Sequence, residues 1–320
     1  MNKSTLRFII SKFLELVLTL IVVTMISFVL VRFSPIDPAE AYAHRSMAAY
    51  SYTDQQMDEL RTQMGLNDTL PVQYINWVKD ALQLDFGKSF VSGQPVLEKI
   101  MSAISITISI VLISAVIQIV FILLVGCLCY ICRKRIVGHL LTFLCIAGIS
   151  IPSFFFASTY IDIFAVKLRL TSVVGNIGIM RYLPAAICIA IGCVAFFAPL
   201  LSTNIEKEMR LDSAFYARCR GLSEMQILLR YALPTACISI LPNFFQMLGL
   251  CMAGSAIVER VFSLPGLGYL IIDSVLYRDS PVIHATILFL AFALVLFNIL
   301  SDILRRALQR DQSADEGARL

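Results

Sequence analysis

Long apolar stretches separated by short polar ones run along most of the chain. Windows without Asp, Glu, Lys or Arg cover residues 16–31, 100–132, 136–161, 182–205, 231–258 and 280–301. Each provides the roughly 20 apolar residues of a membrane-spanning helix, provided that the first extends back to Phe8. The pattern therefore predicts an all-α membrane protein with six transmembrane helices.

The first two windows need separate interpretation. The first has the alternative of a cleaved signal peptide, because Ala41-Tyr42-Ala43 follows it. A span is favoured, since its apolar region is longer than the roughly 7–15 residues usual in signal peptides. The second window is too long for one upright span. We expect a single helix there, with an interfacial extension that begins near Pro95.

Lysine and arginine predict the orientation, because they gather on the cytoplasmic side of membrane proteins. With the N-terminus inside, the inner segments carry 15 of these residues and the outer segments carry 11, of which six lie in the long segment 32–99. Long outer segments cross the membrane regardless of charge and count least. We therefore expect both termini in the cytoplasm.

Composition supports a membrane protein and excludes several other classes. Of the 320 residues, 58% are hydrophobic and 15% are charged, against about half and about a quarter in soluble domains. The net charge of +4 gives no indication of nucleic-acid binding. No nucleotide-binding loop, zinc-protease motif or nucleophile elbow is present. Most of the nine cysteines lie inside apolar windows as small apolar residues, so neither disulfides nor a metal site are expected.

The sizeable segment outside the spans is residues 34–98. It is too small to bury much core alone, so we expect a small helical cap that lies on the membrane domain. His44 in this cap is a candidate ligand contact, whereas His139 and His284 are expected at membrane interfaces. Capping and breaking residues predict the cap's elements: Pro35 and Pro38 end the first span, Thr53 and Gln56 have capping-box spacing, Gly65 ends that helix, and Pro71 begins another that continues through Trp77 to Leu84.

A polar stretch between spans four and five, within 206–233, predicts a compact docking knob. Asp212 is an expected N-cap, and Gly221 an expected C′ residue, of a helix about 12 Å long. Ser223 and Gln226 have capping-box spacing and restart a helix, with Leu222 and Ile227 at staple spacing. The sequence thus predicts two short helices joined by a sharp corner on the cytoplasmic side.

This stretch resembles the cytoplasmic loop of ATP-binding-cassette importer permeases, in the form found in the peptide/nickel branch. The matching positions are Asp212, Ala217-Arg218-Cys219-Arg220-Gly221-Leu222 and Tyr231-Ala232-Leu233. Phe215 and Tyr216 replace the glutamate and first alanine of the general motif. Further matches are Ser34-Pro35-Ile36-Asp37-Pro38, Gly65-Leu66-Asn67-Asp68, Val72-Gln73-Tyr74, Asp85-Phe86-Gly87, Glu259-Arg260-Val261-Phe262-Ser263-Leu264-Pro265-Gly266-Leu267-Gly268, Arg278-Asp279-Ser280-Pro281, Asn298 and Asp302, with Leu264 where tryptophan is usual.

The resemblance implies the type I importer permease fold in the bacterial inner membrane, with three segments: 1–33 as N-terminus and first span, 34–98 as extracytoplasmic cap, and 99–320 as a five-span core. It implies a second homologous permease, two cytoplasmic ATPase subunits that bind ATP and magnesium, and an extracytoplasmic binding protein. This chain is expected to be non-catalytic and to bind no cofactor. The implied ATPase-coupling residues are Asp212, Ala217, Arg218, Arg220, Gly221 and Leu222, and the implied outer gate or turn comprises Glu259, Pro265, Gly266 and Gly268.

Polar residues within span five point to the transport path. Asn243, Gln246 and Met247 lie about one turn apart, and polar groups in a span face the bundle interior or water. Interhelical hydrogen bonding and path lining both remain open for them. Near the inner end of span six, Arg305 or Arg306 is expected to pair with Asp302.

The substrate is the least determined feature of the sequence. The short segment 162–181 and the pattern around Trp77 resemble nickel members of the branch, so nickel or a metal chelate is the first hypothesis. Di- or oligopeptides are the alternative. A stand-alone channel or secondary carrier is a more remote one, since no inverted repeat is evident. An intramembrane enzyme would need paired catalytic groups inside spans, which the sequence lacks.

Overall fold

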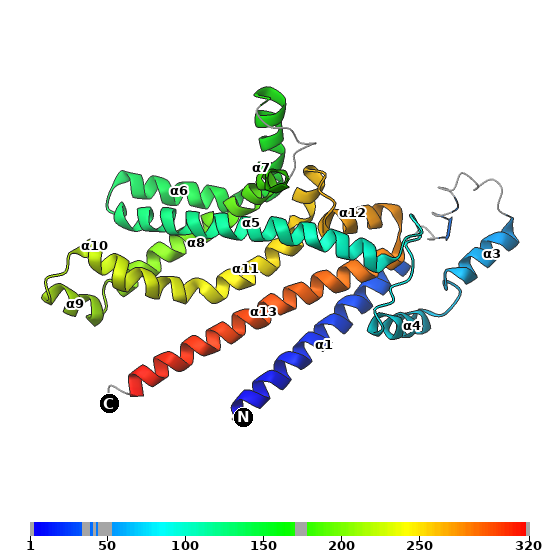
Figure 1. Cartoon of the computed structure of the whole chain (residues 1–320), viewed down its shortest axis with the longest axis horizontal. Helices are drawn as coiled ribbons and strands as arrows, with labels where there is room; N and C mark the ends of the chain where they lie inside the picture. Colours follow the sequence, from blue (N-terminus) through cyan, green and yellow to red (C-terminus); the bar gives the residue numbers. More distant parts are fainter. Residues whose placement is uncertain (1–2, 34–38, 41–42, 44–52, 170–177, 318–320) are drawn as a thin grey trace. The chain divides into compact units, whose positions relative to one another are not determined.

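The computed structural model describes residues 3–33, 39–40, 43, 53–169 and 178–317. Within these ranges the regular elements are helices, beside one isolated bridge between Lys88 and Pro95 (Figure 1). Five helices are long and apolar enough to cross a membrane, and a bent pair raises the number to six. The predicted all-α membrane fold is confirmed. His44, the Ser34–Pro38 motif and most of Ala41-Tyr42-Ala43 lie outside the described residues.

The chain divides into two compact units, each of which joins distant parts of the sequence. The first unit comprises Met1–Thr107 and Ser263–Val295, and the second comprises Ile108–Phe262 and Leu296–Leu320. The first unit contains α1 (Lys3–Arg32), α3 (Asp54–Gln63), α4 (Leu70–Leu82), α12 (Leu267–Tyr277) and the first parts of α5 (Val96–Ile131) and α13 (Ser280–Gly317). The second contains the rest of α5 and α13, with α6 (Ile136–Ser150), α7 (Ser153–Tyr160), η1 (Ile161–Lys167), η2 (Gly178–Arg181), α8 (Leu183–Glu208), α9 (Asp212–Cys219), α10 (Glu224–Ile227), η3 (Leu228–Ala232) and α11 (Leu233–Val261).

The predicted local signals of the cap are present. Thr53 and Gln56 form a capping box at the start of α3. Gly65 adopts a φ of +66° just after that helix, where the backbone conformation favours glycine. Pro71 lies in the first turn of α4. Helix α5 begins at Val96, directly after Pro95, as the predicted extension requires.

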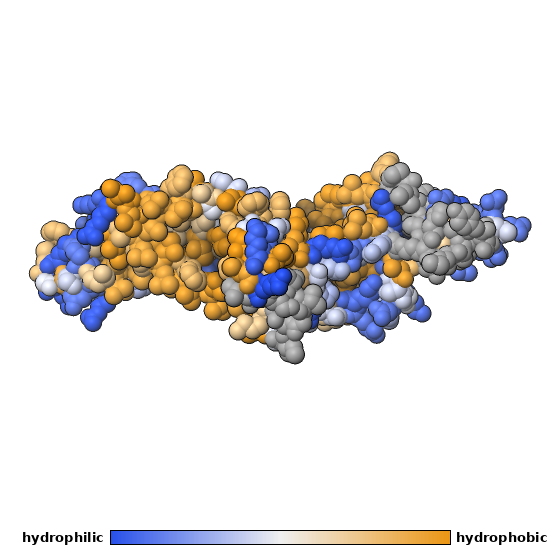
Figure 2. All heavy atoms as spheres, turned by 90° about the horizontal axis from the view of Figure 1, so that it is seen from above, coloured by the Kyte–Doolittle hydropathy of each residue, from blue (hydrophilic) through white to orange (hydrophobic). Residues whose placement is uncertain are grey.

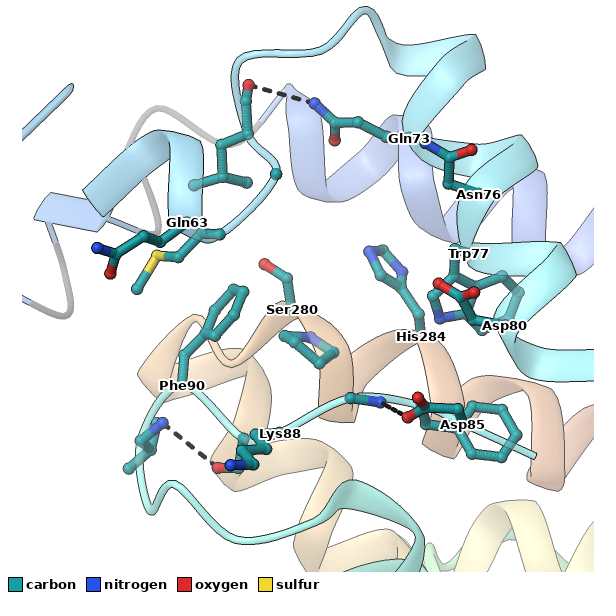
Figure 3. A pocket seen from close by; sticks show the side chains of 18 of the residues that line it. Gln63, Gln73, Asn76, Trp77, Asp80, Asp85, Lys88, Phe90, Ser280 and His284 are labelled. Carbon is teal, nitrogen blue, oxygen red and sulfur yellow. Dashed lines mark hydrogen bonds between the residues drawn. The ribbon is translucent and has the colours of Figure 1, made fainter. Parts of the chain in front are cut away.

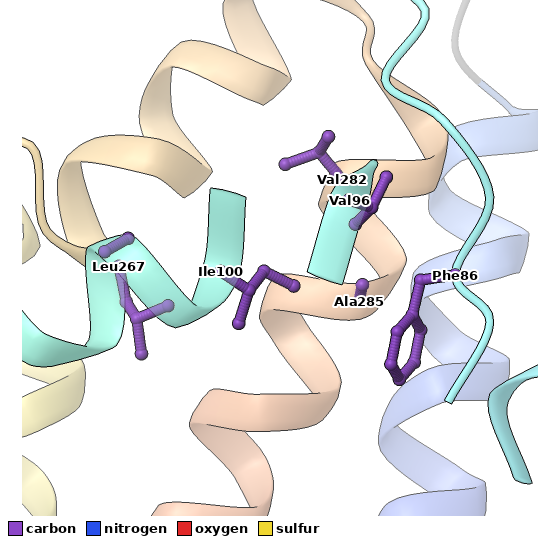
Figure 4. Packing of buried hydrophobic residues seen from close by; sticks show 7 residues of the cluster. Phe86, Val96, Ile100, Leu267, Val282 and Ala285 are labelled. Atoms are coloured by element: carbon purple, nitrogen blue, oxygen red, sulfur yellow. The ribbon is translucent and has the colours of Figure 1, made fainter. Parts of the chain in front are cut away.

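The cap helices depend on the rest of the first unit for burial. Neither α3 nor α4 has a fully buried residue. Trp77 of α4 instead packs against a cluster of buried residues from the 85–93 loop, α5, α12 and α13. Figure 4 shows the residues of this cluster. The members of this cluster are Phe86, Val96, Ile100, Ala103, Leu267, Val282 and Ala285. The expectation that the cap lies on membrane helices is confirmed.

The third predicted span is not one straight helix. Helices α6 and α7 meet at an angle of 95°. Ile151 at the break is extended, with φ −95° and ψ 122°, because the ring of Pro152 disfavours helical conformation in the residue before it. Pro152 also lacks the N–H needed to continue the ladder of α6. Over the predicted span 136–161 the structure thus has a bent pair of helices, a break that the apolar window did not indicate.

His284 lies in the interior of the first unit, a burial that its position at the end of a span did not indicate. Its side chain is 6% exposed. Its Nδ1 lies 2.8 Å from the Ser27 hydroxyl, and its ring stacks on Phe28 with centroids 3.8 Å apart. These partners come from a helix more than 250 residues earlier in the chain, which no local pattern could indicate.

The second unit is held together by small residues between long helices. A Cβ at Gly126 of α5 would lie 2.9 Å from a methyl carbon of Leu201 on α8, so any larger residue would require Leu201 to shift. Cys193 of α8 and Cys251 of α11 are buried free thiols with sulfur atoms 3.4 Å apart. Hydrophobic residues cover much of the visible surface (Figure 2), which is typical of a protein that contacts lipid and other subunits.

Candidate functional site

The polar segment after α8 forms a short helix with a defined end. Helix α9 runs from Asp212 to Cys219, and Gly221 follows with a φ of +83°. The Gly221 N–H donates to the Arg218 carbonyl, and the Leu222 N–H donates to the Ala217 carbonyl. These two bonds form a Schellman motif, which satisfies carbonyls at the end of the helix. The predicted left-handed glycine is confirmed, so the corner is encoded locally.

The start of α9 differs from the prediction by one residue. Leu211 is the N-cap and makes no side-chain capping bond, whereas Asp212 is the first residue of the helix. The prediction of Asp212 as N-cap was wrong. Its carboxylate still lies in the first turn, where it interacts favourably with the positive end of the helix dipole.

The second helix of the predicted knob is not a separate element. Ser223 and Gln226 form the expected capping box at the start of α10. That helix then continues through the π turn Leu228–Ala232 into α11, so that Glu224–Val261 is one long helix (Figure 1). Pro234 lacks the N–H that an α-helix would need there, and the wider turn accommodates it. The knob is therefore α9 together with the first turn of a spanning helix.

Arg218 connects three parts of this segment. Its guanidinium donates to both carboxylate oxygens of Glu224, at 2.6 and 3.1 Å, and to the Met209 carbonyl at 3.1 Å. Met209 is the C-cap residue directly after α8, and Glu224 is the first residue of α10. The hydrogen bond with Glu224 raises the pKa of Arg218. The pair is exposed, so it contributes little stability, but its two-point geometry fixes the orientation of α9.

One face of α9 carries exposed aromatic side chains. Ala214 and Ala217 are buried within the second unit, to which α9 belongs, whereas Phe215 and Tyr216 are 59% and 67% exposed. Their rings contact each other edge to face, with centroids 6.1 Å apart. Large exposed aromatics are typical of surfaces that bind another protein. Comparison with the motif identified Phe215 and Tyr216 only as replacements. Two adjacent aromatic residues in a short polar helix were the signal that could have indicated a contact surface.

The candidate path residues of α11 have different surroundings. The Arg305 guanidinium of α13 donates to the Asn243 side-chain oxygen at 3.2 Å. Asn243 therefore makes an interhelical hydrogen bond with Arg305. Gln246 is exposed and Met247 is half-buried. A lining role for these three residues stays a prediction.

The predicted outer turn interrupts the helices where its composition suggests. Helix α11 ends at Val261, and α12 begins at Leu267, directly after Pro265 and Gly266. The Leu267 N–H, at the start of α12, donates to the Thr107 hydroxyl of α5 at 2.8 Å. Gly268 is buried in the first turn of α12. Glu259 lies in the last turn of α11, where it is fully buried and accepts a hydrogen bond from Ser255 at 2.9 Å.

Asp279, between α12 and α13, joins distant parts of the first unit. The carboxylate is 1% exposed. It accepts hydrogen bonds from the Ser89 hydroxyl and, at 2.9 Å, from the Phe90 backbone N–H. The Lys99 ammonium lies 3.9 Å away. The sequence matched Asp279 to a motif but gave no indication of these partners, which lie about 180–190 residues earlier.

Comparison with known families places these features in context. The family described as "binding-protein-dependent transport system inner membrane component" matches residues 122–313. The N-terminal component of the same transport systems matches residues 5–111. The chain belongs to this family. Members are permease subunits of ATP-binding-cassette importers, so this permease is a multi-pass protein of the inner membrane, as predicted.

Curated relatives of this permease match nearly its whole length. The glutathione transport system permease protein GsiC of Escherichia coli (strain K12) is 31% identical over 303 residues, which are 95% of this chain and 97% of that protein. GsiC of Shigella boydii serotype 4 (strain Sb227) is similar to the same extent, also 31% over 303 residues. The resemblance to the peptide/nickel branch is thereby confirmed.

Solved structures support the fold. The inward-facing MetNI methionine ABC transporter matches with a TM-score of 0.55 at 19% identity, over 65% of this chain and 95% of that one. An amino acid ABC transporter crystallised with histidines matches with a TM-score of 0.50, also at 19% identity, over 66% of this chain and 94% of that one. At this identity the likeness concerns the fold alone, and it supports the predicted type I importer architecture.

Proposed function

We propose that this permease subunit forms the path for short peptides of the glutathione kind. The observation that carries the proposal is the 31% identity to glutathione permeases along 95% of the chain. This similarity supports the peptide alternative over the first hypothesis of nickel or a metal chelate. The nickel hypothesis depended on the segment 162–181, of which residues 170–177 lie outside the described residues, and on a pattern around Trp77.

Coupling in the proposed assembly runs through α9. A second homologous permease would complete the path, and two cytoplasmic ATPase subunits would bind ATP with magnesium. This chain would bind no cofactor and perform no chemistry. The exposed Phe215 and Tyr216 offer an apolar contact surface for the ATPase, and the Arg218–Glu224 pair holds that surface in place. Asp212, Arg220 and Leu222 are proposed to contribute to the same contact.

Transport is proposed to follow alternating access. Closure of the ATPase pair would move α9, and because α10 continues directly into α11, this motion would be transmitted to a spanning helix. Gln246 and Met247 are proposed to line the path on that helix, and the turn at Pro265–Gly268 to form part of the outer gate. The substrate needs only a different affinity for the inward and outward states.

Uptake by whole cells tests the substrate. Deletion of this chain is expected to abolish uptake of radiolabelled glutathione at limiting concentration, or of a dipeptide if the preference is broader, while nickel uptake stays normal. Re-expression of the chain should restore peptide uptake. Loss of nickel uptake with normal peptide uptake would reverse the substrate assignment. Peptide uptake that persists without the ATPase subunits would instead indicate a secondary carrier.

Thiol labelling tests the predicted orientation. Cys219 is exposed on α9, and Asn67 is exposed in the cap. In a chain that retains Cys219 as its only cysteine, a membrane-impermeant maleimide is expected to label only after the cytoplasmic face is opened. With all native cysteines replaced and Asn67→Cys introduced, the reagent should label intact spheroplasts. Labelling of both positions from one side would contradict the six-span topology.

A further inference from the structure

A cavity of about 850 Å³ lies in the first unit, apart from the coupling, path and turn residues assigned above (Figure 3). Its walls come from the end of α3, the face of α4, the loop 85–93 and the start of α13. The volume falls in the range of about 300–1,000 Å³ typical of small-molecule sites. The cavity therefore has room for a ligand of a few residues.

The floor of this cavity is aromatic and rigidly held. Phe28 is 8% exposed, and its ring contacts Trp77 edge to face with centroids 5.3 Å apart. The imidazole of His284 stacks on the Phe28 ring, and its Nδ1 lies within hydrogen-bond distance of the Ser27 hydroxyl. The Trp77 ring also lies near the Phe86 ring, with centroids 6.4 Å apart. Such a floor offers flat apolar surface to a bound molecule at little cost in side-chain entropy.

Two buried hydrogen-bond donors at the floor have no protein partner among the described residues. They are the Ser280 hydroxyl and the Trp77 indole N–H. Ser280 is 7% exposed and points into the cavity at the start of α13 (Figure 3). Buried donors are almost always paired in folded proteins. Both residues belong to the lining of the cavity, so an acceptor on a bound ligand would satisfy donors that the described protein leaves unpaired.

The rim of the cavity is acidic. Its charged side chains are three carboxylates and one ammonium: Asp68, Asp80, Asp85 and Lys88. Asp80 lies beside Trp77 (Figure 3). A carboxylate next to an aromatic ring is a favourable environment for an organic cation, because the ion pair and the ring face both attract it.

We propose that this cavity binds a short peptide with a free N-terminal ammonium. The ammonium is held at Asp80 and Asp85, and a carbonyl or carboxylate oxygen of the same peptide accepts from Ser280 and Trp77. The proposal rests on the proposed function in that peptides are the substrate. It adds a binding site in the first unit, made of residues other than those proposed to line the path.

Trp77 makes the site directly observable, since the chain contains a single tryptophan. The full chain in lipid nanodiscs is titrated with glutathione and with N-acetylglutathione, and tryptophan emission is recorded. Glutathione is expected to change the emission saturably, and its acetylated form to bind roughly tenfold more weakly, since a charge-assisted hydrogen bond is lost. Asp80→Asn should weaken glutathione binding by a similar factor, and Ser280→Ala by a few-fold.

The matched control is Asp54→Asn, which removes a carboxylate from the cap segment outside the cavity wall. It should bind glutathione as the unmodified chain does. Circular dichroism of every variant establishes that helix content is unchanged. A flat titration of the unmodified chain, equal binding of the acetylated peptide, or unchanged affinity in Asp80→Asn would overturn the proposal.

Two further measurements distinguish a peptide from other occupants of the cavity, and failure of the cavity site from failure of the proposed function. A response to Ni²⁺ alone, or only after the purified binding protein is added, would assign the cavity to a metal or to a protein segment and overturn the peptide site. Lost peptide uptake in the deletion strain, together with a silent Trp77, would leave the proposed function in place and remove the cavity. A glutathione response of Trp77 together with normal peptide uptake in the deletion strain would support the cavity site and overturn the proposed function.

Discussion

Gly221→Val is expected to lower peptide import and transport-coupled ATP hydrolysis by roughly tenfold, because about 1–2 kcal/mol of backbone strain falls on the corner of the coupling segment. Gly221 has a φ of +83°, which β-branched residues resist. No heavy atom lies within 4 Å of a Cβ built there, so the effect comes from the backbone rather than from a clash. The strain should reorient α9 and its exposed aromatic face. Transport and ATP hydrolysis in proteoliposomes measure it.

Two controls distinguish a corner effect from general damage. Gly221→Asn should retain most activity, because asparagine tolerates the left-handed conformation. Gly178 has a φ of +67° and equally open surroundings outside the coupling segment. Gly178→Val therefore carries the same strain and should leave coupling intact. Near-normal coupling in Gly221→Val, with the chain correctly inserted, would refute the importance of the corner.

Asp279→Ala is expected to give the largest loss of stability in the first unit, roughly 3–5 kcal/mol, because its removal leaves buried partners unpaired. The Phe90 N–H, the Ser89 hydroxyl and the Lys99 ammonium all converge on this carboxylate. The corresponding decrease in melting temperature is on the order of 10 °C. Thermal unfolding of the purified full chain in detergent, with limited proteolysis of the cap segment, measures it.

The variants for comparison keep part of this network or avoid it. Asp279→Asn retains an acceptor oxygen for the Phe90 N–H and should show an intermediate loss. Asp54→Asn removes an exposed carboxylate from the first turn of α3 and should cost at most about 1 kcal/mol. If Asp279→Ala melts like Asp54→Asn, the buried carboxylate does not hold the 85–93 loop to α13.

The sequence located most elements because their signals are local. Apolar windows of sufficient length place the spans. Thr53 with Gln56, and Ser223 with Gln226, begin helices through hydrogen bonds that reach only three residues along the chain. Gly65 and Gly221 end helices for a similarly local reason. The coupling segment could be found from sequence for the same reason, although its first helix was expected to begin one residue later than it does.

Errors arose where one residue interrupts an otherwise uniform pattern. Pro152 bends an apolar window that hydropathy alone presents as continuous. The knob was expected to hold a separate second helix, yet a π turn carries that helix through Pro234 into α11. Hydropathy predicts which segments can lie in lipid. Whether a helix continues past a proline depends instead on whether the neighbouring turns can widen to accommodate it.

The sequence by itself determined the class, the spans, the capped corners and the family of this protein. Only the tertiary structure decided the burial of His284 against Phe28, the convergence on Asp279, the Asn243–Arg305 contact and the cavity floored by Trp77. Each of these joins residues more than 50 positions apart. Periodicity and capping patterns involve residues that are neighbours along the chain. They therefore do not predict contacts between helices that are distant in the sequence.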